Sequence, residues 1–172
     1  MNAAAVEMPQ AWLSIGSNMD RERSICGAVK SLRDAFGELV LSSVYESQAV
    51  GFDGDPFYNM VAGLETALSV RSLNDQLRKI EERHGRVRDG VKFSSRTLDI
   101  DLLLYGNAVI NEGEIEIPRD EITQYAFVLL PLAEVAGELK HPVNGCTYQK
   151  LWDAFDPGRQ RLWRVELDLK IY

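Results

Sequence analysis

Two hydrophobic periodicities alternate along this chain, and their order predicts its fold. Apolar residues alternate with polar ones, or form a short apolar run, in four segments that we predict to be β-strands: residues 11–18, 38–47, 57–66 and 96–106. Apolar residues recur at helical spacing after the first segment, from Asp20 to Gly37, and after the third, from Val70 to Gly85. A glycine just beyond a helix is a common stop signal, so both helices are predicted to end there.

The resulting order, β-α-β-β-α-β, predicts a ferredoxin-like α+β fold, an antiparallel sheet with helices packed on one face. Turn residues after the fourth strand predict a short hairpin that runs to Ile117. Further helices are expected at residues 127–139, where a proline interrupts the pattern, and at residues 148–155. The tail from residue 161 alternates again and is predicted to add an edge strand.

The chain has 172 residues, of which 45% are hydrophobic, a size and composition that fit a single domain with a sizeable core. We divide it into a flexible N-terminus (residues 1–10), one domain (residues 11–155) and a C-terminal extension (residues 156–172). No internal repeat or long linker suggests a second domain.

The charge of the chain argues against a nucleic-acid partner and for a small anionic ligand. The formal net charge is -7, and non-specific nucleic-acid binding depends on lysines and arginines that neutralise phosphates. One window differs, because from Arg78 to Arg96 seven basic residues oppose three acidic ones, a net charge of +4. A local positive region on an acidic protein suits a compact polyanion.

The cysteines and the N-terminus predict a cytoplasmic protein without a membrane partner. Cys26 and Cys146 lie far apart and form no CxxC motif, which is typical of free thiols in a reducing compartment. The first ten residues lack the basic region and the apolar length of a signal peptide. No window of the chain approaches the length of a membrane span.

The fourth predicted strand, "RTLDIDLLLYG", carries two aspartates among its apolar residues. Side chains of a strand alternate between its faces, so Asp99, Asp101 and Leu103 share one face. The other face carries the residues that we expect in the core: Leu98, Ile100, Leu102 and Leu104. Two like charges about 6 Å apart repel by roughly 3 kcal/mol at an effective dielectric near 20. Solvent, nearby arginines or divalent cations would offset that repulsion, and water on an exposed face is the simplest alternative.

The residues just upstream favour phosphate chemistry. Glu81, Arg86, Arg88 and Arg96 place guanidinium and carboxylate groups before the strand, and arginine binds phosphate oxygens in a bidentate fork. Carboxylates that hold a metal, together with arginines, supply what phosphoryl transfer requires. No Walker A sequence occurs, which excludes a P-loop nucleotide site.

Three motifs, "GRVR…SRTLDIDLLLYG", "LSIGSN" and "FVLLPLAEVA", resemble the 6-hydroxymethyl-7,8-dihydropterin pyrophosphokinases of folate biosynthesis. The resemblance runs from about Ala11 to about Phe155. It implies a monomeric ferredoxin-like enzyme, a diphosphotransferase that moves the β,γ-pyrophosphoryl group of ATP to the pterin hydroxymethyl oxygen and releases AMP. It also implies two Mg²⁺ ions, with ATP and the pterin as small-molecule partners.

The same resemblance implies roles for individual residues. Asp99 and Asp101 would be the metal ligands, and Arg86 and Arg96 would hold the phosphates and assist the transfer. Residues implied on the ATP side are Glu81, Arg88, Phe93, Leu102 and Arg119. Residues implied in the pterin pocket are Ser47, Val50, Gly51, Phe57, Asn59 and Phe127. Two aromatic rings suit a flat heterocycle, and an asparagine can both donate to and accept from its amide edge.

Three residues depart from the family pattern and keep alternatives open. Many members carry a basic residue in place of Glu114, an aromatic or small residue in place of Asp120, and an arginine in place of Tyr125. A diverged enzyme that uses another pteridine or another nucleotide is therefore the second hypothesis. A non-catalytic ferredoxin-like binding module, for example for RNA, is the third, and the two aspartates on the sheet argue against it.

Overall fold

The computed structural model describes residues 7–85, 98–158 and 160–170. The first part of the chain forms β1 (Gln10–Ser17), α1 (Arg21–Phe36), β2 (Val40–Leu41), β3 (Val44–Ser47), β4 (Phe57–Glu65) and α2 (Val70–Arg83). The second part forms β5 (Asp99–Tyr105), β6 (Ile110–Glu112), β7 (Ile115–Ile117), α3 (Glu121–Gln124), α4 (Ala126–Ala136), α5 (Tyr148–Ala154) and β8 (Leu162–Val165).

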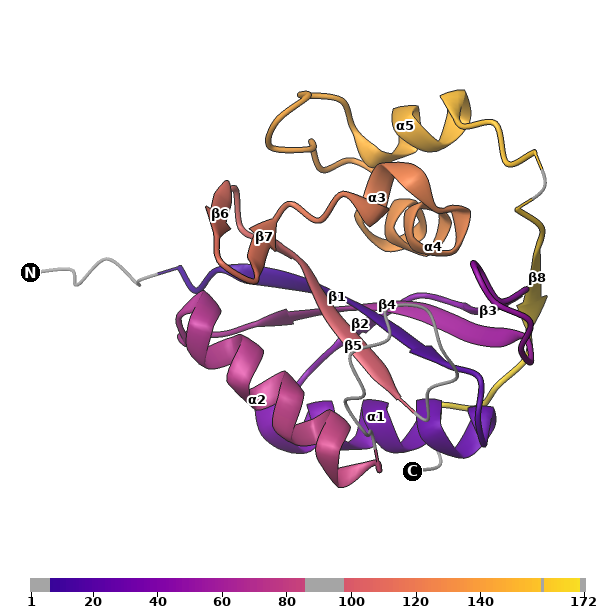
Figure 1. Cartoon of the computed structure of the whole chain (residues 1–172). Helices are drawn as coiled ribbons and strands as arrows, with labels where there is room; N and C mark the ends of the chain where they lie inside the picture. Colours follow the sequence, from indigo (N-terminus) through magenta and orange to yellow (C-terminus); the bar gives the residue numbers. More distant parts are fainter. Residues whose placement is uncertain (1–6, 86–97, 159, 171–172) are drawn as a thin grey trace, which may run out of the picture.

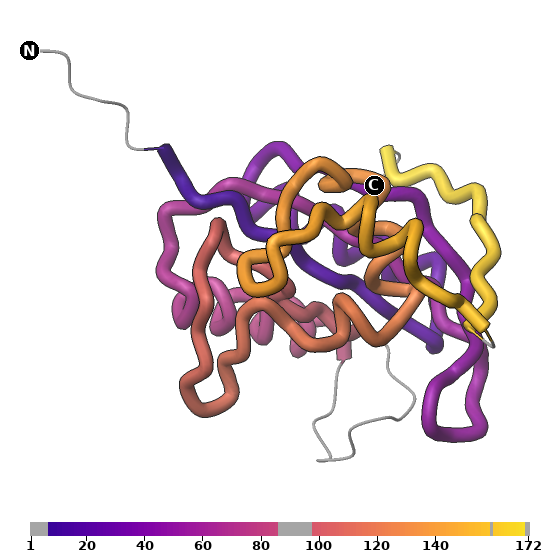
Figure 2. The backbone as a smooth tube through the Cα atoms, turned by 90° about the horizontal axis from the view of Figure 1, so that it is seen from above, coloured from indigo at the N-terminus to yellow at the C-terminus, as the bar shows by residue number. Residues whose placement is uncertain are grey.

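The main sheet has the strand order β5-β1-β4-β3-β8, and β2 also pairs with β4. All its pairs are antiparallel, and β6 and β7 form a separate hairpin. The α+β architecture with an antiparallel sheet confirms the predicted fold class. Figure 2 shows the yellow C-terminal tail running along the side of the molecule where the purple β3 segment lies.

The helices cover both faces of the sheet, so the prediction of helices on one face was wrong. Figure 1 shows α1 and α2 below the sheet and α3, α4 and α5 above it. Each side has its own apolar cluster: Leu13 and Ile15 of β1 pack on the α1–α2 side, and Trp12 packs on the α3–α5 side. Central strands buried on both faces need apolar residues at successive positions.

A β-bulge corrects the predicted alternation along β5. Trp12 pairs with Leu104 and Leu13 with Leu102, so Leu103 is an extra residue without a partner in β1. Ile100 and Leu102 pack among the α1–α2 cluster as predicted, whereas Leu104 joins Leu103 in the α3–α5 cluster. An inserted residue reverses the side on which every later side chain lies, and this is why Leu104 was placed on the wrong face.

The predicted strand over residues 38–47 is divided into β2 and β3 at a serine. Ser42 Oγ accepts a hydrogen bond from the Val61 backbone N–H at 2.8 Å, while the Ser42 N–H donates to the Val61 carbonyl at 3.0 Å. A side chain thus takes one place in the hydrogen-bond ladder with β4.

Two local features fix the helices. Ser69 caps α2 by accepting a hydrogen bond from the Ser72 N–H, and Gly37 and Gly85 follow α1 and α2 with positive φ angles of 82° and 81°. Among the described helices, none is both long enough and apolar enough to cross a bilayer.

Candidate active site

The face of the sheet beneath α3–α5 changes from apolar to polar along its strands, and a cavity of about 330 Å³ lies over the polar part. On β1 the change runs from Trp12, in the apolar cluster, to Ser14 and Gly16, in the cavity. The cavity is lined by Ser14, Gly16, Ser47, Gln48, Val50, Phe52, Phe57, Asn59, Asp99, Asp101, Leu103, Arg119, Glu121, Tyr125, Phe127 and Val128.

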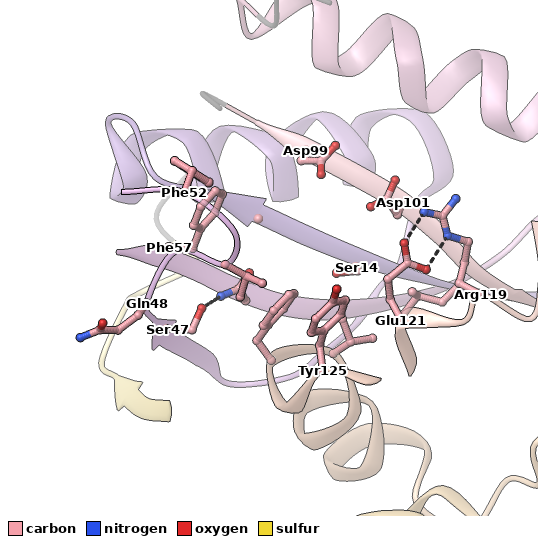
Figure 3. Close-up of a pocket in the computed structure, with 16 residues that line it drawn as sticks. Ser14, Ser47, Gln48, Phe52, Phe57, Asp99, Asp101, Arg119, Glu121 and Tyr125 are labelled. Carbon is pink, nitrogen blue, oxygen red and sulfur yellow. Dashed lines mark hydrogen bonds and ion pairs between the residues drawn. The ribbon is translucent and has the colours of Figure 1, made fainter. Parts of the chain in front are cut away.

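The two aspartates of β5 stand at one end of this cavity, on the same face of the strand (Figure 3). Asp99 pairs with Gly16 of β1, and Asp101 pairs with Ser14. Because β1 carries only small side chains at these two positions, the space above the carboxylates stays open to a ligand.

The environment of Asp101 disfavours its charge. Burial, followed by the nearby charge of Asp99, raises the pKa of Asp101 to about 7, and Glu81 and Glu121 add to the effect while Arg119 opposes it. A carboxylate whose negative form is costly without a cation is one that a cation would bind favourably.

Arg119 and Glu121 form a bidentate ion pair at the same end. Arg119 Nη2 donates to Glu121 Oε1 at 2.8 Å, and Nε donates to Oε2 at 3.1 Å. The bulge in β5 helps to place this pair, because the Leu103 carbonyl accepts a hydrogen bond from the Arg119 N–H at 3.1 Å. Figure 3 shows the guanidinium beside Asp101. Although burial lowers the pKa of Arg119, the charges of Asp101 and Glu121 raise it overall, so this residue stays cationic.

The opposite end of the cavity is aromatic with a polar centre. Asn59 Nδ2 donates to Ser47 Oγ at 2.7 Å, and both side chains are nearly inaccessible to solvent. Tyr125 stacks on Phe127 with ring centroids 5.1 Å apart and planes 13° from parallel, and Phe57 meets Phe52 edge to face. A flat heterocycle would find aromatic surface and an amide group here.

Most of the predicted site residues that the structure describes line this one cavity: Ser47, Val50, Phe57, Asn59, Asp99, Asp101, Arg119 and Phe127. Gly51 lies next to Val50 in the same loop but is not a lining residue. Arg86, Arg88, Phe93 and Arg96 lie outside the described residues.

Two residues predicted on the ATP side have buried side chains outside the cavity. Leu102 is 4% exposed and packs in the α1–α2 cluster, on the other face of the sheet. Glu81 is 2% exposed and accepts a hydrogen bond from the Ile100 N–H at 2.7 Å, which fixes the beginning of β5 against α2. The side chain of Leu102 therefore cannot line the cavity, because it points to the opposite side of the strand from Asp101.

The sequence did not predict several lining residues, above all Ser14, Gly16 and Glu121, and it singled out Tyr125 only as a departure from the family pattern. Ser14 and Gly16 belong to "LSIGSN", where the alternation with buried neighbours signals one shared face. Glu121 and Tyr125 belong to α3 and its end, whose position over the sheet has no local signal.

Two of the three departures from the family pattern lie outside the cavity. Glu114 forms an ion pair with Arg78 at 2.6 Å on the surface, and Asp120 stands at the N-terminus of α3. Tyr125, the third, is part of the aromatic wall.

Comparisons with known proteins decide the family. The model of the family described as 7,8-dihydro-6-hydroxymethylpterin-pyrophosphokinase (HPPK) matches residues 12–137. The chain belongs to the HPPK family. It is 37% identical to 2-amino-4-hydroxy-6-hydroxymethyldihydropteridine pyrophosphokinase of Haemophilus influenzae over 139 residues, which cover 78% of this chain and 86% of the relative. The enzyme of the same name from Aquifex aeolicus is 32% identical over 152 residues, which cover 87% and 92% of the two chains.

Solved structures support the fold. A crystal structure described as "HPPK-DHPS in complex with substrates" superposes with a TM-score of 0.69 at 12% identity, over 86% of this chain. The chain spans 43% of the length of that protein. A structure described as Plasmodium falciparum HPPK-DHPS wild type with pteroate gives a TM-score of 0.68 at 15% identity and a coverage of 44% of that protein.

Proposed function

We propose that the cavity over β1, β4 and β5 is the active site of a pyrophosphokinase. As a member of the HPPK family, the chain transfers pyrophosphate from ATP to hydroxymethyldihydropterin in folate biosynthesis. The observation that supports this site most directly is that the two ends of the cavity carry different kinds of side chain. Paired carboxylates and an arginine lie at one end, and aromatic rings with an amide lie at the other.

The acidic end fits Mg²⁺. Asp99 and Asp101 provide only oxygen donors, and Mg²⁺ is commonly held by one or two carboxylates together with substrate phosphates and water. Within the described residues no group of three or more His, Cys, Asp or Glu side chains is placed to hold a metal. We propose that these two aspartates hold the two Mg²⁺ ions, which when bound would neutralise phosphate charge.

The charges that line the cavity support a requirement for cations at this end. Among the described lining residues, Asp99, Asp101 and Glu121 are acidic and Arg119 is basic, which gives a formal charge of -3 + 1 = -2. A triphosphate would be repelled by this set alone. Arg86 and Arg96, for which phosphate binding is implied by the family resemblance, stay predictions, as do Arg88 and Phe93 on the nucleotide side.

The chain's own groups have distinct tasks in this proposal. Asn59 and the rings of Phe57 and Phe127 hold the pterin and orient its hydroxymethyl oxygen toward the aspartates. Arg119 stays charged and donates to phosphate oxygens, and Glu121 keeps its guanidinium in place. Orientation and electrostatic stabilisation are the main contributions that a protein makes to phosphoryl transfer.

A diverged substrate remains the second candidate function, and Tyr125 is the residue that favours it. Its ring lies in the cavity against Phe127, so a bound pteridine would meet an aromatic ring where many members of the family carry an arginine. A side-by-side assay of several 6-substituted pteridines measures this selectivity.

The cellular location and the oligomeric state of the protein stay predictions. A cytoplasmic location is supported by Cys26 and Cys146, which are both free. A monomer is expected from the family resemblance, and the mass measured by light scattering during size-exclusion chromatography tests it.

The central test measures AMP formed from ATP and 6-hydroxymethyl-7,8-dihydropterin with and without Mg²⁺. We expect AMP release that requires both the pterin and the metal. The variant Asp99→Ala should lose at least about a hundredfold in rate, in line with the loss of a group that stabilises transferring charge, and should unfold at a temperature near that of the unaltered protein. Full activity in this variant would remove Asp99 from the proposed metal site.

A further inference from the structure

The aromatic wall of the cavity begins at the junction between two helices. α3 ends at Gln124 and α4 begins at Ala126, and Tyr125 alone separates them, with an extended backbone (φ -121°, ψ 127°). The direction in which the rings of Tyr125 and Phe127 project therefore depends on the backbone of a single residue. Both rings line the cavity.

A side chain from the C-terminal extension holds this junction on both sides. Gln160 Oε1 accepts a hydrogen bond from the Ala126 N–H at 2.8 Å, and Gln160 Nε2 donates to the Gln124 carbonyl at 3.1 Å. These are the groups that helix ends leave without intrahelical partners, the first N–H of α4 and the last carbonyl of α3. One amide thus closes a ring around Tyr125.

The extension also contacts the other side of the cavity. Two residues after Gln160 it enters β8, where Leu162 pairs with Ser47 at the end of β3. Ser47 accepts the hydrogen bond from Asn59 in the pterin end of the cavity. The family match ends at residue 137. Gln160 and Leu162, which lie beyond it, therefore contact two sides of a cavity whose lining residues all lie within the match.

We propose that Gln160 is a positioning residue for pterin binding, an inference that rests on the proposed function of the aromatic end. Without its two hydrogen bonds the α3–α4 junction samples other backbone conformations, and the stacked pair is correctly placed for only a fraction of the time. The apparent affinity for the pterin then falls by that fraction. The ATP end depends less on the junction, because Asp99 and Asp101 belong to β5 and, of the described residues at that end, only Glu121, at the far end of α3, belongs to a helix of the junction.

Graded substitutions of Gln160 test this inference in the full-length chain. Gln160→Met keeps the length of the side chain and loses both hydrogen bonds, while Gln160→Glu keeps the acceptor for the Ala126 N–H and loses the donor. Gln149→Met is the matched control, because it removes another amide hydrogen bond, from Gln149 to Asp153 on α5, outside the cavity. Steady-state kinetics give kcat and the KM for each substrate, and titration gives the Kd of the pterin.

We expect Gln160→Met to raise the KM and Kd of the pterin roughly tenfold. This is the effect of a roughly tenfold decrease in the fraction of molecules whose α3–α4 junction has the conformation that binds the pterin. Gln160→Glu should lie between this variant and the unaltered protein, and the KM of ATP should change less than about twofold in both. Unchanged pterin binding in Gln160→Met, or an equal rise for both substrates, would overturn the inference. The variant Phe127→Ala distinguishes a failure of this inference from a failure of the proposed function. Unchanged pterin binding in Phe127→Ala would refute the aromatic pterin site itself, whatever the role of Gln160.

Discussion

We predict that the charged form of Asp101 destabilises the folded protein when no metal is bound. The variant Asp101→Asn tests this prediction directly. Burial and the charge of Asp99 raise the pKa of Asp101 from 3.8 to about 7. The folded state therefore binds this proton more tightly than the unfolded state does, so the free energy of unfolding decreases as pH rises between these two values. The destabilisation is absent below pH 3.8, grows up to about pH 7 and is constant above it.

The magnitude follows from the same two pKa values. A difference of one pKa unit corresponds to about 1.4 kcal/mol, so ionised Asp101 lowers the free energy of unfolding by at most about 4 kcal/mol above pH 7. At about pH 5 only the pH range from 3.8 to 5 contributes, and the free energy of unfolding is lowered by at most about 1.6 kcal/mol. Because the cavity is open to water and Asn introduces its own polar group, we expect Asp101→Asn to stabilise the metal-free protein by about 1–3 kcal/mol at about pH 8.

Urea unfolding in the presence of a chelator, at about pH 5 and about pH 8, measures this stabilisation. Asp75→Asn is the matched control, because it removes an exposed carboxylate from α2 at a position outside the cavity. Added Mg²⁺ should stabilise the unaltered protein and the control, leave Asp101→Asn unchanged, and restore no AMP formation to that variant. A variant less stable than the unaltered protein at about pH 8, or one that keeps full activity, would refute the reasoning.

Two further predictions concern glycines that leave room for a neighbouring side chain. A Cβ atom at Gly63 would lie 2.6 Å from the Trp12 ring, so Gly63→Ala should destabilise the fold by about 1–3 kcal/mol in urea unfolding, and a change under about 0.5 kcal/mol would contradict this packing. A Cβ atom at Gly16 would lie 3.2 Å from Asn59 Oδ1, so Gly16→Ala should raise the Kd of the pterin about 3- to 30-fold by shifting the amide; an unchanged pterin Kd would remove Asn59 from the pterin contacts.

The sequence alone predicted much of the acidic end of the site, because its signal is local. Alternation in a strand fixes which side chains share a face, and this placed Asp99 beside Asp101 without any knowledge of the rest of the chain. The motifs around them carried the family resemblance, and the family match confirms it. The same local rule misplaced Leu104, since a single unpaired residue in β5 reverses the faces and leaves no mark in the hydrophobic pattern.

What only the tertiary structure decided is how the second helical layer completes the cavity. Helical spacing predicted α4 and α5, but a helix with apolar residues around most of its surface does not indicate which face of a sheet it covers. Packing on the face opposite α1 and α2 brings Tyr125 and Phe127 over β4, and it places the local ion pair of Arg119 and Glu121 in the same cavity as Asp101. The contact between Gln160 and the α3–α4 junction spans 34 residues. Such long-range contacts result from the way the whole chain packs, whereas the order of its strands and helices was already contained in short stretches of sequence.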